Sequence, residues 1–546
     1  MDSTGTLFAA ALAVPLVLLL ACASKVLRAR MPVLLSIAPL PALAAALFAN
    51  IPSEWVLGNP NFALVFALDV PGAMLLGAAA LLWSLCGAYA GRYLRGRTDA
   101  GSFVVCWLMT LIGCIGVFLA ADLIGFYLLI AVLSVGATGL VLQGDGAAAQ
   151  RAGGIYLGLA LLAEAFLLVG LVLMAASTPH GSLLIRDGVA ALATSPMRDL
   201  TLTLLLVGLG VKAALFPLHF WMPLAHDAAP VPASAVLSGA VVKTSVLALI
   251  RFLPLGSAVP DFGTALAAIG LFGALYGVAI GITQSRPKLV LAYSSVSQMG
   301  FVVAIIGMGL AAGDGGTALA AAFYAVHHLL VKGALFLAVG VIAATGRAHV
   351  RAMWLPAAVI ALGLGGLPLT GGALTKYAVK DLFGDGIAAT LAMVSSITTT
   401  LLMLHFLKQL LRNTAADDTA RAPIGFVGPW LAMALASIVV PWTLYLAIPI
   451  DTLPKALAPA ALWSGLWPVL IGAVLAVGLD RVWNRLPRIA AGDVGAVLEI
   501  LERVGAASSV VFERADTFLR RWVSATIMLA IFIALFGWTL ATQAFQ

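Results

Sequence analysis

The sequence predicts an all-α polytopic membrane protein, and three observations lead to this fold class. Hydrophobic residues make up 62% of the 546 residues and charged residues only 10%, and the mean hydropathy is +1.09. The apolar residues are gathered in about sixteen runs that can each cross a bilayer. Most lysine and arginine residues lie between these runs. Since a soluble protein needs about 25% charged residues, the composition excludes soluble globular proteins, secreted disulfide scaffolds, disordered chains and nucleic-acid binders.

The expected spans follow from the requirement for about 20 mostly apolar residues per crossing. They cover residues 7–24, 33–49, 71–90, 103–120, 122–142, 153–176, 200–218, 233–253, 263–283, 289–310, 317–344, 355–380, 387–407, 425–447, 461–480 and 522–543. The segment 182–197 is predicted to be a loop with a short surface helix. Segment 490–520 has apolar residues at helical spacing with charges between them. It predicts an amphipathic surface helix, serving either as an interfacial anchor or as a strut against a neighbouring subunit.

The distribution of basic residues predicts the orientation. With the N-terminus outside, 21 of the 30 lysine and arginine residues fall in inward loops and 4 in outward loops. Because inward loops carry the excess of positive charge, we expect a multi-pass protein of the bacterial cytoplasmic (inner) membrane. The first apolar run follows Asp2 and precedes the basic cluster at 25–30, which is the reverse of a signal peptide, so it is interpreted as a retained helix.

Resident redox or metal chemistry is not expected in this chain. Its four cysteines form no CxxC pair, and each lies in an apolar run: Cys22, Cys86, Cys106 and Cys114. A structural zinc or iron–sulfur site needs closely spaced thiolates. We therefore expect no cofactor, no metal and no redox or hydrolytic site, and a net charge of +7 that serves a lipid surface rather than a nucleic acid.

Ionisable side chains inside the apolar runs are the candidate functional residues. An ionisable group in hydrocarbon costs a few kcal/mol and usually marks a proton or ion path. Lysine or histidine held there can load and release a proton near neutral pH. We expect a proton relay formed by five residues: Lys212, Lys243, His328, Lys376 and Glu164. Alternatively, these groups extend toward the membrane surface or bond a backbone carbonyl. We favour this alternative for three further residues in apolar runs: His327, Lys332 and Lys380.

Two of the predicted spans are broken by proline and glycine near a lysine. Lys212 lies five residues before Pro217, and Pro368 lies eight residues before Lys376. Broken helices free backbone groups that hold water or ions, and a pair of them indicates an internal repeat. A five-span repeat unit inverts its topology. His219 and His226 follow the first break and are candidates for proton uptake or for capping of the loop.

The residues around these lysines resemble the antiporter-like subunits of respiratory complex I (NADH-quinone oxidoreductase chains L, M and N), of multisubunit Na⁺/H⁺ antiporters and of energy-converting hydrogenases. The resemblance covers about residues 65–410. It rests on GLGVKAALFPLHFWMPLAHDAAPVPASAVLSGAVVKTSVLALIRF at 208–252, RPKLVLAYSSVSQMGF at 286–301, HHLLVKGALFLAVG at 327–340, GLPLTGGALTK at 366–376 and ALDVPGAML around Asp69.

The resemblance implies a core of fourteen helices with two inverted five-helix repeats, broken seventh and twelfth helices and one proton channel. It implies N-terminal helices 1–3 in residues 1–100, repeats in 101–255 and 260–410, and C-terminal spans in 425–480. The amphipathic helix 490–520 and a last span 522–543 follow. By motif, the family's functional positions fall on Lys212, Lys243, His328 and Lys376. From their place in apolar runs, Lys332, Lys380 and His327 are further proton uptake or gating candidates.

Two positions depart from the family pattern. Ala131 stands where the fifth span usually carries a glutamate, and Tyr324 stands where some members carry the first of two histidines. Glu164, one span later, is the one glutamate within a predicted span. We therefore expect it to replace the missing carboxylate beside Lys212.

Three functions remain open from the sequence. The first is a proton-translocating subunit, with other membrane subunits and a soluble or redox partner, moving H⁺ or Na⁺ in a complex I-like, hydrogenase or inorganic-carbon-uptake complex. The second is a self-contained cation/proton secondary transporter. The third is a scaffold whose channel is inactive.

Overall fold

A computed structural model describes residues 3–59, 62–178, 181–448, 453–487, 489–490 and 492. The predicted amphipathic helix 490–520 and the last span 522–543 lie outside these residues, apart from positions 490 and 492. Twelve helices of the described part are long and apolar enough to cross a membrane. The mostly helical, multi-pass architecture is therefore confirmed.

The N-terminal segment contains short helices and a hairpin. Its elements are α1 (Ser3–Ala21), α2 (Lys25–Leu34), α3 (Leu40–Phe48), β1 (Ser53–Asn59) and β2 (Phe62–Leu68). The prediction of one span over 33–49 is wrong, because α2 ends at Leu34 and α3 begins beyond Pro39, which cannot donate a helical hydrogen bond. The strands pair antiparallel from Ser53 opposite Leu68. The prediction missed this hairpin, although Asn59-Pro60-Asn61 is a turn signal.

The next group of helices leads to the first break. It comprises α4 (Val70–Tyr93), α5 (Ala100–Leu119), α6 (Leu123–Leu142), α7 (Gly146–Ser177), α8 (Ile185–Leu192), α9 (Arg198–Lys212), α10 (Trp221–Ala228), α11 (Val231–Val236), the π-turn η2 (Leu237–Val241) and α12 (Val242–Phe252). Asp69 and Asp122 cap α4 and α6 by accepting from Gly72 and Gly125 backbone N–H groups. Asp122 also accepts from Val65 N at 2.7 Å and so ties the hairpin to α6.

The following group contains the second break. It comprises α13 (Pro260–Gly281), α14 (Pro287–Ala312), α15 (Thr317–Ala343), α16 (Val350–Gly365), α17 (Gly371–Val379), the 3₁₀ turn η3 (Lys380–Phe383) and α18 (Ile387–Leu411). Helices α13 and α14 touch backbone to backbone, because a Cβ on Gly270 would stand 2.5 Å from the Gly300 carbonyl oxygen. Small residues allow such close approach between membrane helices.

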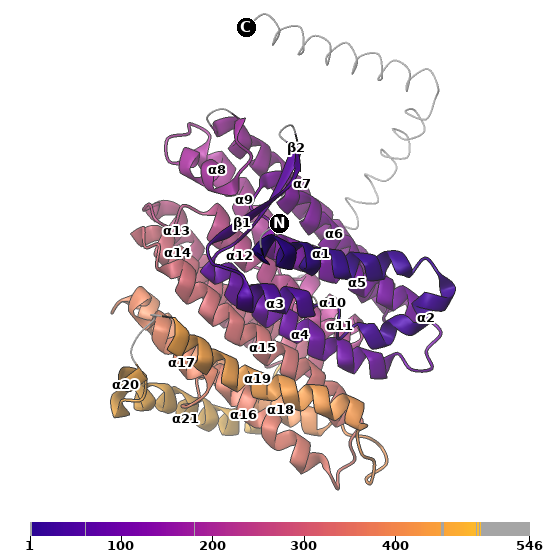
Figure 1. Ribbon diagram of the computed structural model, residues 1–546. Coiled ribbons are helices and arrows are strands. Elements are labelled where there is room, and N and C mark those ends of the chain that lie inside the picture. The colour runs from indigo at the N-terminus through magenta and orange to yellow at the C-terminus, as the bar shows by residue number, and fades with distance from the viewer. Residues whose placement is uncertain are drawn as a thin grey trace, which may run out of the picture. The chain divides into compact units, whose positions relative to one another are not determined.

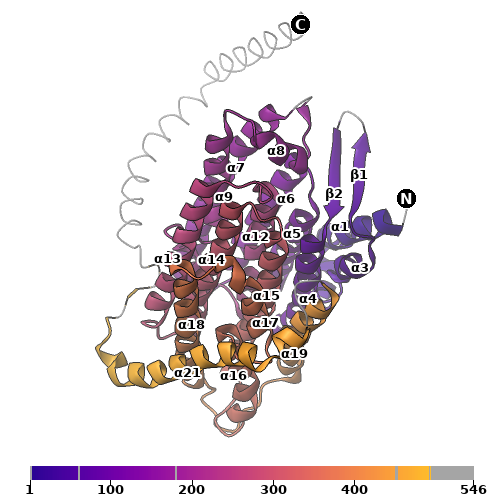
Figure 2. The same ribbon diagram turned by 90° about the vertical axis from the view of Figure 1, so that its left-hand side faces the viewer.

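The C-terminal described helices are α19 (Ile424–Ala447), α20 (Leu453–Ala456), α21 (Pro459–Val482) and the 3₁₀ turn η4 (Trp483–Arg485). Helices α14 and α15 lie between the N-terminal helices and the group α16–α21 in both views (Figure 1, Figure 2). The most apolar window of α14 is entirely buried and that of α15 nearly so. Polar groups on these two helices are therefore shielded from lipid, which is where a proton path through a membrane protein has to lie.

Candidate functional site

The first break places Lys212 at the end of a helix. Helix α9 ends at this residue, Ala214 adopts a left-handed backbone with φ of 53°, and α10 starts only at Trp221. The Trp221 indole N–H donates to the Val211 carbonyl at 2.8 Å and so holds the two half-helices together. The ammonium of Lys212 therefore lies where the backbone is irregular, a geometry tolerated at membrane depth only inside a protein.

A buried ion pair occupies this break. Lys212 Nζ lies 2.8 Å from Glu164 Oε1 on α7, and both side chains are about nine-tenths buried. Lys212 also donates to the Ser134 hydroxyl on α6. Ala131, where the family glutamate is expected, precedes Ser134 by one helical turn on the same helix. The carboxylate thus comes from α7 instead of α6, and it contacts the same lysine.

A small cavity adjoins the ion pair. Its volume is about 20 Å³, and its walls include Ser134, Lys212 and Thr244. A cavity holds one water when it offers about 10–15 Å³ and two or more polar partners. The cavity therefore has room for a single water between Lys212 on α9 and Thr244, the neighbour of Lys243 on α12.

Lys243 is buried beside an irregular turn of its own helix. Its Nζ donates to the Ser238 carbonyl at 2.7 Å, and Ser238 lies in η2. A π-turn weakens the regular hydrogen-bond ladder and often occurs at functional sites. The wider turn leaves the Ser238 carbonyl accessible to a side chain five residues later.

A hydrogen-bonded chain links Lys243 to Lys332. The hydroxyls of Ser238 and Ser295 are 2.8 Å apart, and Ser295 Oγ donates to the Leu291 carbonyl at 3.1 Å. Lys332 Nζ donates to that same carbonyl at 2.9 Å. Helices α12, α14 and α15 are thus connected by polar atoms that are all buried.

The two adjacent histidines of α15 have different neighbours. His328 is fully buried, and neither of its ring nitrogens has a hydrogen-bond partner within the described residues. It lies within electrostatic range of Lys243 and Lys332. His327 lies within range of Lys376 and packs against the start of α17, where a Cβ on Gly371 would stand 2.7 Å from its ring.

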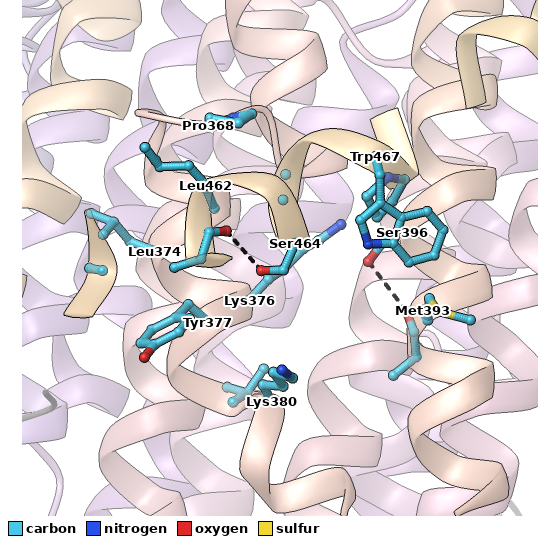
Figure 3. A pocket seen from close by; sticks show the side chains of 18 of the residues that line it. Pro368, Leu374, Lys376, Tyr377, Lys380, Met393, Ser396, Leu462, Ser464 and Trp467 are labelled. Carbon is cyan, nitrogen blue, oxygen red and sulfur yellow. Dashed lines mark hydrogen bonds between the residues drawn. The ribbon is translucent and has the colours of Figure 1, made fainter. Parts of the chain in front are cut away.

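The second break places Lys376 against a free helix end. Helix α16 ends at Gly365, Leu369 is left-handed with φ of 64°, and α17 begins at Gly371. Lys376 Nζ reaches back 2.7 Å to the Gly365 carbonyl, one of the unpaired acceptors at a helix C-terminus. Its side chain also borders a cavity of about 430 Å³ (Figure 3).

Three predicted candidates remain, and one of them, His226, lies within electrostatic range of Lys243 and Lys332. His219 lies in the first break, stacked on Phe216, and His226 on α10 is buried against Phe336. Lys380 begins η3 and is exposed, so the expectation that it lies inside a span is wrong: α17 ends one residue earlier. Among the described residues, no three His, Cys, Asp or Glu side chains come together as metal ligands.

Sequence reasoning missed the uncharged members of the site. These include Ser134, Ser238 and Ser295, together with a buried set in which Tyr324 donates to Gln298 at 2.8 Å and Gln298 donates to Thr399 at 3.1 Å. Hydroxyl and amide residues are common in helices, so their identity alone does not single them out. A signal was nevertheless present, because Ser294, Ser295, Ser297 and Gln298 crowd one apolar run.

Comparison with known proteins gives the family relationship. A family model described as "NADH:quinone oxidoreductase/Mrp antiporter, TM" matches residues 120–402. NADH-quinone oxidoreductase subunit N of Desulforudis audaxviator is 32% identical over 55% of this chain, which spans 60% of that protein. Hydrogenase-4 component B of Escherichia coli is 25% identical over 78% of this chain and 72% of its own length.

A solved structure has the same fold. The structure of the Mrp complex from a Dietzia species aligns with a TM-score of 0.78 and 21% identity, covering 98% of this chain and 63% of the matched chain. At this identity the likeness shows the fold alone. The functional assignment therefore depends on the family match and on the geometry of the buried residues.

Proposed function

The chain belongs to the NADH:quinone oxidoreductase/Mrp antiporter transmembrane family, and on that premise we propose that it moves protons across a membrane as one subunit of a larger complex. The observation that carries the proposal is the Lys212–Glu164 ion pair, buried at a helix break. An ion pair is expensive to keep in a hydrophobic interior, and burial of this kind usually marks a functional path. A protein selected only for stability would be more stable with apolar residues in place of this ion pair.

The mechanism uses the pair as a store for one proton. While Glu164 faces Lys212, the ammonium is stabilised and the proton stays. If Glu164 swings away, the isolated ammonium becomes unfavourable in the low-dielectric interior, and the proton leaves. The adjacent cavity of about 20 Å³ offers one water to accept it. The protons of the pair are exchanged jointly, because the two groups are in contact.

The onward path runs through α12 and α15 to α17. Lys243 donates to the Ser238 backbone carbonyl and Lys332 to the Leu291 carbonyl, and the Ser238–Ser295 hydroxyl pair lies between these two contacts. His328 adds a buried ring beside Lys243 and Lys332, and His327 lies beside Lys376. An imidazole ring has one nitrogen that can accept and one that can donate a proton, so it can pass a proton between the lysines. His219 and His226, in and after the first break, are proposed to supply protons to the path from one side.

The finer topology is part of the proposal. We infer a fourteen-helix core with inverted repeats in 101–255 and 260–410. Support comes from the two breaks, each with a left-handed non-glycine residue and a nearby lysine. The N-terminus is placed outside and the chain in the bacterial inner membrane, with the boundaries 1–100 and 425–480 flanking the repeats. The distribution of basic residues supports this orientation.

Membership in a multisubunit complex is proposed from the printed names of the relatives, which are subunits of a quinone oxidoreductase, a hydrogenase and an Mrp complex. A soluble or redox partner within the complex would drive the pair open. The test compares proton flux in proteoliposomes that hold the purified chain alone with flux in vesicles that hold its native complex. Flux only in the complex supports a driven subunit. Equal flux from the chain alone identifies a self-contained transporter instead.

A further inference from the structure

The cavity between α17, α18 and α21 has the size of a lipid chain. Its volume is about 430 Å³, inside the range of about 300–1,000 Å³ typical of ligand sites. A single flexible hydrocarbon chain fits a space of this size.

The cavity runs through one leaflet of the bilayer. Helix α18 has 25 residues, which is about the full membrane thickness at 1.5 Å per residue, so its first residue Ile387 lies near one surface. Lys380, Gly384 and Asp385 line the cavity at this end. Pro368, in the helix break, lies at the opposite end, with Lys376 between (Figure 3).

The walls open toward lipid. Three of the lining side chains are more than a third exposed although apolar: Leu369, Met393 and Leu457. Leu374, Leu462 and Trp467 continue the apolar lining inward. Polar side chains, among them Ser396 and Ser464, lie between these apolar groups, and a hydrocarbon chain from the bilayer can enter through the exposed apolar side.

Among the lining residues at the rim, one is a cation and one an anion, and they do not pair with each other; the exposed Asp381 next to Lys380 is not part of the lining. Lys380 and Asp385 are both exposed, and no hydrogen bond or ion pair joins either side chain to another described residue. A headgroup with a phosphate and a primary ammonium presents the complementary charges. Lys380 can receive the phosphate, and Asp385 can accept hydrogen bonds from the ammonium. A choline headgroup has no N–H to donate, and a glycerol headgroup has no cation.

We propose that this cavity binds one phospholipid with a primary ammonium headgroup, such as phosphatidylethanolamine. One acyl chain fills the space along α17 past Lys376, the phosphate contacts Lys380 and the ammonium contacts Asp385. The bound chain forms a wall beside Lys376 that keeps bulk water from its ammonium on the lipid side. The lipid site does not depend on proton movement and stands without the proposed function.

Native mass spectrometry of the full-length chain tests this site. The chain is delipidated in detergent and then given palmitoyl-oleoyl phosphatidylethanolamine, phosphatidylcholine or phosphatidylglycerol. We expect one tightly retained phosphatidylethanolamine, bound roughly fivefold better than phosphatidylcholine, the ratio that one exposed ionic contact supplies. Equal retention of all three lipids by the unmodified chain overturns the proposal.

Substitutions at the rim test the headgroup contacts separately from the contacts of the acyl chain. Asp385→Asn should bind phosphatidylethanolamine no better than phosphatidylcholine, and Lys380→Ala should weaken both. Asp261→Asn, an exposed aspartate at the start of α13, is the control and should leave the preference unchanged. An unaltered preference in Asp385→Asn contradicts the assigned headgroup contact.

Two further variants fill the cavity from opposite walls. Ala392→Trp on α18 and Ala461→Trp on α21 should each abolish retention while the thermal transition and the elution volume stay those of the parent. Using two walls guards against one variant that fails to fold. Retained phosphatidylethanolamine in either folded variant overturns the site.

Discussion

Lys212 Nζ and Glu164 Oε1 are 2.8 Å apart although the residues lie 48 positions apart on α9 and α7. The lysine ends a half-helix and the glutamate comes from the middle of an unbroken helix, so motion of either helix changes their separation. This gives the pair a mechanical connection to the rest of the bundle. It also places a carboxylate beside the lysine without the usual residue at position 131.

Substitution of the pair should abolish transport. Glu164→Gln should reduce proton flux to the level of Lys212→Ala, because the stored proton loses its counter-charge. Loss of one partner of a buried pair also costs about 3–5 kcal/mol of stability. Flux is measured with a pH-sensitive dye in vesicles containing the complex. Glu54→Gln, which removes a surface partner of Arg186, is the control, and normal flux in Glu164→Gln contradicts the mechanism.

The double variant Glu164→Gln/Lys212→Met separates folding from transport. With no charge left in the break, the thermal transition should return toward the parent value, whereas flux should stay at the level of either single variant. Non-additivity in both readouts is expected for two groups in direct contact.

The Ser238 and Ser295 hydroxyls between Lys243 and Lys332 should contribute jointly to proton flux. Ser238→Ala and Ser295→Ala should each slow proton flux at least tenfold, and the double variant should be no slower than the singles, since either change breaks the same chain. Each should lower stability by only about 1 kcal/mol. Ser245→Ala is the matched control, because that buried hydroxyl bonds locally to the Val242 carbonyl. Additive losses in the double variant would indicate two independent paths.

Replacement of His328 should raise the stability of the protein and abolish proton flux. Its ring nitrogens are buried without hydrogen-bond partners in the described structure. His328→Leu therefore removes a desolvation cost that no hydrogen bond offsets. The free energy of unfolding should rise by about 1 kcal/mol while flux is lost. His405→Leu is the comparison: its Nε2 lies 2.8 Å from the Gln284 carbonyl, and its loss should destabilise the protein. A destabilised His328→Leu would show that the ring has a structural role.

The second break should not tolerate a side chain at Gly372. A Cβ there would stand 1.8 Å from the Gly363 carbonyl oxygen, closer than any real contact. Gly372→Ala should therefore separate α16 from α17, lower the thermal transition and stop transport. Gly428→Ala on α19 meets nothing within 4 Å and should stabilise its helix by up to about 1 kcal/mol. An unchanged thermal transition in Gly372→Ala would contradict this packing.

The fold could be predicted from the sequence wherever hydropathy alone decides it. A bilayer leaves room only for helices of about 20 apolar residues, so the long spans were predictable. The failures lie at residues 33–68. There prolines divide an apolar run into two short helices, and a hairpin is held by Asp122 from a distant part of the chain.

The candidate site divides in the same way. The lysines, histidines and Glu164 were identifiable because charge is rare inside apolar runs. Their partners were not, since Lys243, Lys332 and Lys376 all bond backbone carbonyls, and every residue has one. Which carbonyl is free depends on a π-turn, a helix break and the packing of a neighbouring helix.

By itself, the sequence determined that this chain is a membrane protein of this family with ionisable residues inside its spans, because burial in lipid leaves a compositional record. The sequence also led us to expect Glu164 beside Lys212, as the structure shows. Only the tertiary structure decided that the Ser238 and Ser295 hydroxyls lie between the contacts of two lysines, and that Lys380 lies at a surface rim. Those relationships arise between helices that are distant in the chain. Hydropathy can be read from one segment, whereas side-chain packing depends on several segments at once.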